Sequence, residues 1–276
     1  PRSTLSSSSA ASDVYKRQIH HTAIVSPEAK LGDGVKIGPY AIVGEGVTLG
    51  DHVSIAAHAV VEGNTEIGDN TAISPFASVG SPPQDSKGMG DNGRLVIGSN
   101  NIIREAVTVN TGTKKGGGLT IIGDGNMLMA YSHVAHDCHI GNNNTFANVV
   151  TLAGHVEVED FVVIGGLVAV HQFVRIGRNS FIGGGIVTQK DIPPYIRVIQ
   201  AKERGARPMG LNTIGLKRRG FTEETMLALK RAYKIVWRSG LRVGDALQKM
   251  EETLFHIEEV KRFADFIRAS ERGIVR

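Results

Sequence analysis

An apolar residue, almost always aliphatic, recurs at every sixth position through much of the chain, and this period constrains the fold more than any other feature. One series has eleven consecutive members from Ile19 to Val79, and a second has eleven from Ile122 to Ile182. An α-helix repeats every 3.6 residues, so a period of six excludes helical structure for this region. A fixed short period instead indicates stacked units that bury a continuous core between them.

The residues around these anchors predict the shape of each unit. An anchor is often followed by Gly and then by Asp or Asn, as in Leu49-Gly50-Asp51, and Gly and Asn tolerate positive φ. Each hexad is therefore expected to form a short strand and a tight corner, and three hexads a triangular coil of about 18 residues. This pattern resembles the left-handed parallel β-helix of the hexapeptide acyltransferases, a mostly β fold that we expect over residues 19–190.

The rest of the chain is expected to differ from the coils. Residues 1–18 are serine-rich and lack an apolar run, which indicates a disordered or non-native leader. Residues 80–94 and 110–120 interrupt the hexads and are predicted to project as loops. We interpret the glycine run in the second loop as a flexible segment, because it lacks a Walker pattern. Residues 191–276 are predicted to form a linker and a small C-terminal α-helical domain, with Thr222 as a helix N-cap.

Composition narrows the class of protein. Hydrophobic residues make up 41% of the chain, enough for a core, and Cys138 is the single cysteine, so no internal disulfide can form. The apolar runs fall short of the ~20 residues that a membrane span needs. We therefore expect a cytoplasmic protein without stable membrane insertion. Residues 191–276 carry 18 Lys and Arg against 11 Asp and Glu, a net charge of +7, which indicates either an anionic partner or a solvated helical surface.

Half of the ten histidines lie within the short segment from His133 to His171. In a coil of about 18 residues, positions i and i+18 stack on one another. Two neighbouring columns are then predicted: His136, Gly154 and Gln172, and beside them Asp137, His155 and Phe173. Histidine can take a proton from a hydroxyl, a neighbouring carboxylate fixes its tautomer, and a glycine amide can donate to an oxyanion. The columns predict acid–base chemistry, with a zinc site of the γ-class carbonic anhydrase kind as the alternative.

Four separate motifs resemble one family closely. They are HVAHDC at residues 133–138, NVVTLAGH at 148–155, AVHQF at 169–173 and GLKRRGF at 215–221. In this order they are similar to the UDP-N-acetylglucosamine 3-O-acyltransferases, which catalyse the first step of lipid A biosynthesis, and the resemblance runs from about Ile19 to Arg276. The segment 196–209 departs from the pattern, being about three residues longer and lacking a histidine, so no nucleotide contact is assigned to it.

The resemblance implies a reaction and the residues that perform it. A homotrimer without a metal or free cofactor would transfer a 3-hydroxyacyl chain from the phosphopantetheine of acyl carrier protein to UDP-N-acetylglucosamine, with no nucleic acid as partner. His136 would be the general base, Asp137 would orient it, and Gly154 would supply the oxyanion-hole amide. The positions that match substrate-binding residues are Gln84, Asp85, Lys87, His133, His155, His171, Gln172, Asn212, Arg218 and Arg219.

Two further points follow from the resemblance. Gly184 matches the position that sets acyl-chain length, where glycine goes with longer chains. The acceptor can be N-acetylglucosamine or its 3-amino analogue, and the second would give an amide instead of an ester.

Overall fold

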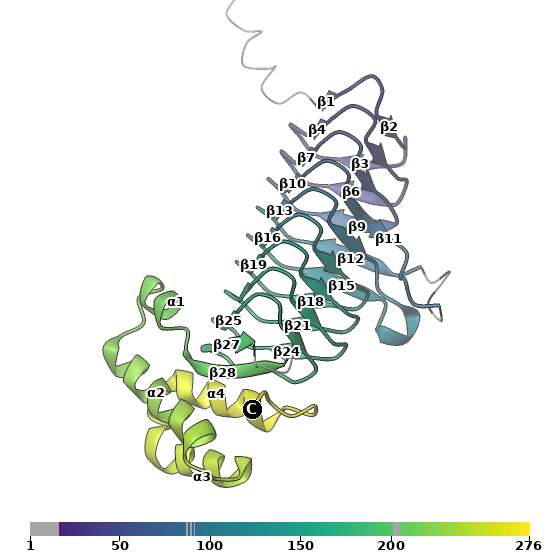
Figure 1. The fold of residues 1–276 in the computed structure, drawn as a ribbon. Helices are drawn as coiled ribbons and strands as arrows, with labels where there is room; N and C mark the ends of the chain where they lie inside the picture. Colours follow the sequence, from purple (N-terminus) through teal and green to yellow (C-terminus); the bar gives the residue numbers. More distant parts are fainter. Residues whose placement is uncertain (1–16, 87, 89, 91, 201–204) are drawn as a thin grey trace, which may run out of the picture.

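The protein forms a triangular β-helix with a group of helices at one end. The structure, a computed structural model, describes residues 17–86, 88, 90, 92–200 and 205–276. Strand β1 lies at the end of the prism opposite to the helices (Figure 1). This arrangement confirms the predicted left-handed parallel β-helix with a small helical C-terminus.

Within the described residues, three sheets form the faces of the prism. Sheet A contains β1 (Gln18–Ile19), β4 (Lys36–Ile37), β7 (Ser54–Ile55), β10 (Ala72–Ile73), β13 (Ile102–Ile103), β16 (Met127–Leu128), β19 (Thr145–Phe146), β22 (Val163–Ile164), β25 (Phe181–Ile182), β27 (Ile196–Gln200) and β28 (Ala206–Leu211). Sheet B contains β2 (Ile24–Val25), β5 (Ile42–Val43), β8 (Val60–Val61), β11 (Ser78–Ser81), β14 (Thr108–Asn110), β17 (His133–Val134), β20 (Thr151–Leu152), β23 (Ala169–Val170) and β26 (Val187–Thr188). Sheet C contains β3 (Lys30–Leu31), β6 (Val47–Leu49), β9 (Asn64–Ile67), β12 (Arg94–Ile97), β15 (Leu119–Ile122), β18 (His139–Ile140), β21 (Glu157–Val158) and β24 (Arg175–Ile176).

The hexad anchors fill the interior of the prism. Ile37, Ile73, Leu128 and Ile164 are each at most 2% exposed, and each is the last residue of a two-residue strand. Neighbouring side chains along a strand point to opposite faces, so the preceding residue faces outwards. The core is therefore one continuous column of aliphatic side chains, and it needs few aromatic residues.

Strand register shows how the chain accommodates its two interruptions. Most strands pair in parallel with the strand one coil later, as Lys36 does with Ser54. Ala72 pairs with Ile102 and Ile102 with Met127, so the first loop adds two hexads and the second adds a hexad plus one residue. The hexad anchors show the same offsets in the sequence, since they keep their phase across the first loop and shift by one residue across the second. Strands β11, β12, β14 and β15 take up the ends of the two predicted loops, which are therefore slightly shorter than expected.

The corners use more residue types than the sequence suggests. Phe76 and Leu167 have φ of 62° and 61°, a region that bulky residues normally avoid. Hydrogen bonds between coils hold most of these corners, where a corner N–H donates to a corner carbonyl in the coil before it, as Leu167 N–H does to Asn148 O at 3.0 Å. His58 N–H, for example, donates to Pro39 O at 3.1 Å.

The two ends of the β-helix differ from the prediction. Gln18 pairs with Lys36, so the first coil begins inside the segment expected to be a leader; residues 1–16 of that segment lie outside the described residues. After residue 190 the β-helix continues: β27 extends sheet A beside β25, and β28 folds back on β27 as an antiparallel hairpin. The linker predicted here is therefore in part the cap of the β-helix.

The C-terminal helices are α1 (Thr213–Arg218), α2 (Glu223–Arg238), α3 (Val243–Leu254) and α4 (Glu258–Arg268). Thr222 caps α2 as predicted, with its hydroxyl accepting from Thr225 N–H at 3.1 Å. The chain end returns to the β-helix, where Asp191 accepts from Ser270 Oγ at 2.6 Å. No helix in the described residues is both long and apolar enough to cross a membrane.

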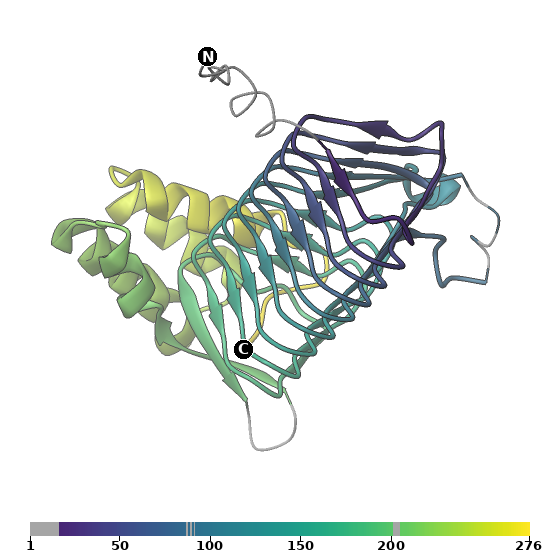
Figure 2. The ribbon, with the colours of Figure 1, turned by 90° about the horizontal axis from the view of Figure 1, so that it is seen from above.

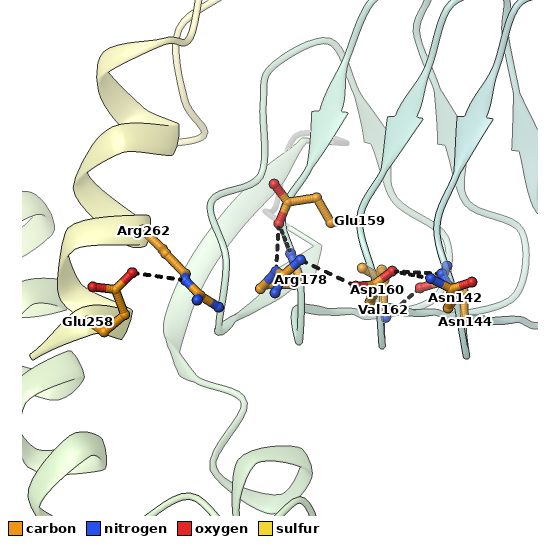
Figure 3. A network of polar contacts seen from close by, with 8 residues as sticks. All are labelled: Asn142, Asn144, Glu159, Asp160, Val162, Arg178, Glu258 and Arg262. Atoms are coloured by element: carbon orange, nitrogen blue, oxygen red, sulfur yellow. Dashed lines mark hydrogen bonds and ion pairs between the residues drawn. The ribbon is translucent and has the colours of Figure 1, made fainter. Parts of the chain in front are cut away.

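A ladder of polar contacts runs along the corner between sheets C and A towards α4 (Figure 3). Asn142 N–H donates to Asp160 Oδ1 at 2.8 Å, and Arg178 Nη2 donates to Asp160 Oδ2 at 3.3 Å. Arg262 of α4 pairs with Glu258 on its own helix. These contacts link Asn142, Asp160 and Arg178 from coil to coil, whereas the buried Asn144 Nδ2 and Asn179 Oδ1 at the same corner have no hydrogen-bond partner among the described residues.

Candidate active site

The candidate site lies at the corner between sheets B and C. The His136–Asp137 turn follows β17, and His155 and Phe173 occupy the equivalent turns in the next two coils. His155 N–H donates to His136 O at 3.1 Å, and Phe173 N–H donates to Gly154 O at 3.2 Å. The rings of His155 and Phe173 stack with centroids 4.4 Å apart. The residues therefore form the two columns that the coil period predicts.

His136 and Asp137 form a directly hydrogen-bonded pair. His136 Nδ1 lies 2.7 Å from Asp137 Oδ2, and the two side chains are 15% and 1% exposed. His155 Nε2 lies 3.7 Å from the same carboxylate oxygen. An ionised carboxylate can only accept hydrogen bonds, so the proton of a neutral His136 is on Nδ1. Nε2 then carries the free lone pair that a general base needs.

The loop after β14 packs onto this pair. Thr113 donates to Asp137 Oδ1 through its N–H at 2.9 Å and to Oδ2 through its hydroxyl at 2.7 Å. Asp137 N–H donates to Thr120 Oγ1 at 2.8 Å. The segment interpreted as a flexible loop instead contains the 3₁₀ turn η1 (Lys114–Gly116) and covers a buried carboxylate. Figure 2 shows the loops after β11 and β14 projecting from the same edge of the prism.

The surroundings of the corner favour an ionised Asp137 and neutral histidines at positions 133 and 155. Burial opposes ionisation of Asp137 and is the largest single influence, but hydrogen bonds from Thr113 and His136 outweigh it and lower the pKa of the carboxyl. Burial lowers the pKa of His155, while Asp137 acts in the opposite direction. Burial and the neighbouring His136 lower the pKa of His133. Near neutral pH, His133 and His155 are therefore neutral and Asp137 is ionised.

A pocket of about 560 Å³ opens over the pair. It brings together the predicted residues Gln84, Asp85, His136, Gly154, His155 and Gln172. It is also lined by Phe173, which the coil period placed above His155, and by residues that sequence reasoning missed, namely Thr113, Lys115, Ala135 and Ala153. Among the described residues, nothing accepts a hydrogen bond from Gly154 N–H, so this donor is available to a bound molecule.

Other predicted residues lie outside this pocket. His133 faces outwards on sheet B, with Nδ1 2.7 Å from Thr108 Oγ1. His171 Nδ1 lies 3.1 Å from Gln172 O and 3.3 Å from Arg272 Nη2. Lys87 lies outside the described residues. Gly184 occupies the corner between sheets A and B, where an added Cβ would be 3.0 Å from Gly166 O.

The residues expected near the nucleotide phosphates lie at the third corner of the prism. Asn212 caps α1 by accepting from Gly215 N–H at 3.2 Å. Arg219 lies over the Phe161 ring at 4.8 Å, and burial lowers its pKa. Arg218 is exposed on α1. Within one chain, the structure therefore does not bring these three residues to the His136 pocket.

His136, Asp137 and His155 also have the spacing of a metal site, since one ligand atom from each lies within 4.8 Å of the others. Asp137, however, already accepts hydrogen bonds from His136 Nδ1 and from Thr113. The donor atoms thus bind one another, as expected for an acid–base pair, and a metal would have to replace these bonds.

Comparison with known proteins identifies the family. Residues 191–275 match the family described as UDP N-acetylglucosamine O-acyltransferase, domain 2, and residues 28–63 and 119–154 match bacterial transferase hexapeptide repeats. The acyl-[acyl-carrier-protein]–UDP-N-acetylglucosamine O-acyltransferase of Alkalilimnicola ehrlichii is 54% identical over 259 residues, which is 94% of this chain and 99% of that protein. The protein of the same name from Stenotrophomonas maltophilia (strain R551-3) is 49% identical, over 94% of this chain and 98% of that protein.

Solved structures agree with the sequence relatives. The UDP-N-acetylglucosamine acyltransferase from Bacteroides fragilis superimposes with a TM-score of 0.90 at 41% identity, covering 94% of this chain and 100% of that one. The enzyme from Acinetobacter baumannii superimposes with a TM-score of 0.89, also at 41% identity, covering 94% and 99%. The repeats, the helical segment and these likenesses lead to one conclusion: the chain belongs to the family of acyl-[acyl-carrier-protein]–UDP-N-acetylglucosamine O-acyltransferases.

Proposed function

We propose that this protein transfers a 3-hydroxyacyl chain from acyl carrier protein to the 3-hydroxyl of UDP-N-acetylglucosamine, the first step of lipid A biosynthesis. The observation that carries the proposal is the hydrogen-bonded His136–Asp137 pair beside the available Gly154 N–H, in a chain of this family. An acyl transfer to a hydroxyl needs a base and an oxyanion donor, and these residues can supply both.

The reaction follows from this geometry. His136 Nε2 takes the proton of the sugar 3-hydroxyl, and the hydroxyl oxygen attacks the carbonyl carbon of the thioester. Asp137 stabilises the imidazolium that forms and stays ionised. Gly154 N–H donates to the oxygen that becomes negative. The intermediate then collapses: the C–S bond breaks, the thiolate takes the proton from His136, and the new ester leaves. The residues proposed to hold the sugar are Gln84, Asp85, Lys87, His155 and Gln172.

A homotrimer would complete the site. Asn212, Arg218 and Arg219 lie at a different corner from His136, so they can reach a bound nucleotide only from a neighbouring copy. Guanidinium groups bind phosphate oxygens well, which suits Arg218 and Arg219 to the diphosphate. In the same assembly His133 and His171, on or next to the outer face of sheet B, would line the cleft between copies. We propose a cytoplasmic location for the assembly.

Acyl carrier protein is proposed to dock on the helical end. A cavity of about 660 Å³ beside α2 is lined by Arg197, Lys217, Lys230, Lys234 and Arg238 together with apolar side chains. Acyl carrier proteins are acidic, so this surface is complementary in charge. The phosphopantetheine arm stays part of the carrier, and no separate cofactor enters the proposal.

The proposal is tested by mass spectrometry of the product formed from acyl carrier protein donors and either UDP-N-acetylglucosamine or its 3-amino analogue. An ester from the first sugar is expected, and exclusive amide formation from the second would refute the assigned acceptor. His136→Ala should lower kcat by ~10²–10⁴ without unfolding the protein. The matched control His139→Ala, an exposed histidine on sheet C, should stay near wild type. Chelators should have no effect, and a drop in activity that added zinc restores would support the metal alternative.

A further inference from the structure

We infer that Thr113, on the loop between β14 and β15, is a positioning residue that fixes where the proton lies in the His136–Asp137 pair. The inference rests on the proposed function, because it concerns the base of that reaction. Thr113 lines the edge of the pocket, but its side-chain hydroxyl and its N–H both donate to Asp137, and so it acts through Asp137.

The hydrogen bonds of Thr113 determine the direction of its hydroxyl proton. Gly116 N–H donates to Thr113 Oγ1 at 3.0 Å, so a lone pair of the hydroxyl is occupied. The single hydroxyl proton is then directed at Asp137 Oδ2, 2.7 Å away. Thr113 N–H donates to the other carboxylate oxygen at 2.9 Å. Both oxygens of Asp137 must therefore accept, which favours the ionised carboxylate.

The state of Asp137 sets the tautomer of His136. An ionised Asp137 accepts from His136 Nδ1 at 2.7 Å, which leaves Nε2 without a proton and ready to act as a base. A protonated Asp137 would instead donate to Nδ1, and the histidine proton would move to Nε2. That tautomer cannot take a proton from the sugar hydroxyl. Thr113 thus selects the active form from two alternatives.

Close packing makes the hydroxyl hard to replace. Thr113 is 4% exposed and the Asp137 side chain 1% exposed. A Cβ added at Gly116 would lie 2.2 Å from Asp137 Cγ, so the loop backbone lies directly against the carboxylate. A water molecule therefore has little room to take over the hydrogen bond. We therefore expect that removal of the Thr113 hydroxyl changes the proton position of the His136–Asp137 pair without compensation by water.

The test compares three substitutions in the full chain with both substrates. Thr113→Val removes the hydroxyl but keeps the shape and the N–H, and should lower kcat by ~10–100-fold with each KM within ~3-fold of wild type. Thr113→Ser keeps the hydroxyl and should recover kcat to within ~3-fold. Thr145→Val, at an outward position on β19, is the matched control and should leave kcat within ~2-fold.

A double-mutant cycle asks whether Thr113 acts through the carboxylate. In an Asp137→Ala background, Thr113→Val should cost less than ~2-fold, because the group that the hydroxyl orients is gone. A wild-type kcat in Thr113→Val, a decrease that Thr113→Ser does not recover, or full additivity in the cycle would each overturn the inference. If Thr113→Val fails to fold, Thr113→Ala is measured with the same expectations.

A second readout is independent of acyl transfer. Diethyl pyrocarbonate modifies an unprotonated imidazole nitrogen, and peptide mass spectrometry follows the reaction at His136. At neutral pH the rate should fall ~10-fold in Thr113→Val and stay near wild type in Thr113→Ser. If wild type forms no product while this difference persists, the proposed function fails and the inference about Thr113 stands. Product formation with an unchanged modification rate refutes the inference alone.

Discussion

A single methyl group at residue 154 should disable the protein. An ideal Cβ built on Gly154 lies 2.5 Å from His136 Cε1 and 2.7 Å from His136 Nε2. Ordinary carbon contacts are ~3.5–4.0 Å, so in Gly154→Ala the imidazole must move by ~1 Å. The φ of Gly154 lies outside the positive range that L-residues avoid, so the alanine backbone itself is not strained.

The displacement sets the size of the effect. The His136–Asp137 hydrogen bond is 2.7 Å long and ceases to count as one beyond ~3.5 Å. A hydrogen bond to a charged group contributes ~1.5–3 kcal/mol, and a misplacement of ~1 Å can cost ~10²-fold in rate. We expect kcat of Gly154→Ala to fall by ~10²–10³. Since Ala keeps the N–H at this position, the decrease reports on His136 and not on the oxyanion donor.

The assay is steady-state acyl transfer, with thermal unfolding as the check on folding. Gly166→Ala is the matched control: it is a corner glycine in a neighbouring coil, and its added Cβ lies 3.2 Å from the nearest atom, Asn148 O. The control should stay within ~2-fold of wild type. A folded Gly154→Ala variant with kcat within ~3-fold of wild type would refute this reasoning, because catalysis would then not depend on the observed position of the His136 imidazole.

The remaining predictions concern the partner, the acyl chain and pH. The KM for acyl carrier protein should rise with salt. Charge reversal at Lys230, which lines the cavity beside α2, and at its exposed neighbour Arg231 should raise the KM further; a flat salt response with silent reversals would contradict the docking surface. Gly184→Met should shift donor preference from about fourteen carbons to shorter chains. Each methylene group that the protein no longer buries should cost ~0.8 kcal/mol of binding free energy for the longer donor. An unchanged preference in a folded variant would show that another residue determines chain length. Burial lowers the pKa of His133, so its contribution to stability is present above the unfolded value of ~6.5 and disappears as pH falls through the folded value. The unfolding temperature should therefore drop between pH 7 and 5, and less steeply in His133→Asn, whereas parallel curves would exclude this histidine as the cause.

Periodicity determines the β-helix so strongly that the sequence alone predicts its register. Once three hexads make a coil, the stacking of His136 under Gly154 needs no further information, because every coil from Ile122 to Ile182 has the same length. The same regularity places Asp137 under His155. The period cannot predict the contacts of segments that do not follow the hexad repeat, such as the projecting loops and the C-terminal cap.

Thr113 and the C-terminal cap illustrate that limit. Thr113 meets Asp137 across 24 residues through a loop without any repeat, and nothing in its local sequence distinguishes it from the threonines nearby. Strands β27 and β28 form because sheet A offers an open edge after β25, an influence that acts from outside the segment. Asn212 matches a binding motif by sequence, yet its amide caps α1 and donates to Asn179 O at 3.0 Å. The cap to Gly215 is local, but the bond to Asn179 O depends on a neighbour distant in the chain, which the local sequence does not reveal.

The coils between the His136 pocket and the C-terminal cap also define a distance that an acyl donor bound at the helical end would have to span. From the turn of His136 the chain climbs through the turns of Gly154 and Gln172 before Asp191 meets the C-terminal tail, and each step is ~4.8 Å. If acyl carrier protein docks on the helical end as proposed, its thioester must extend ~14 Å to meet the base. One extra coil inserted between β21 and β26 would leave every contact around Asp137 unchanged, yet a carrier at the proposed docking surface would hold the thioester one strand spacing short of the sugar hydroxyl. With the carrier at the proposed docking surface, the number of coils between the pocket and the cap would therefore set the reach that the donor needs.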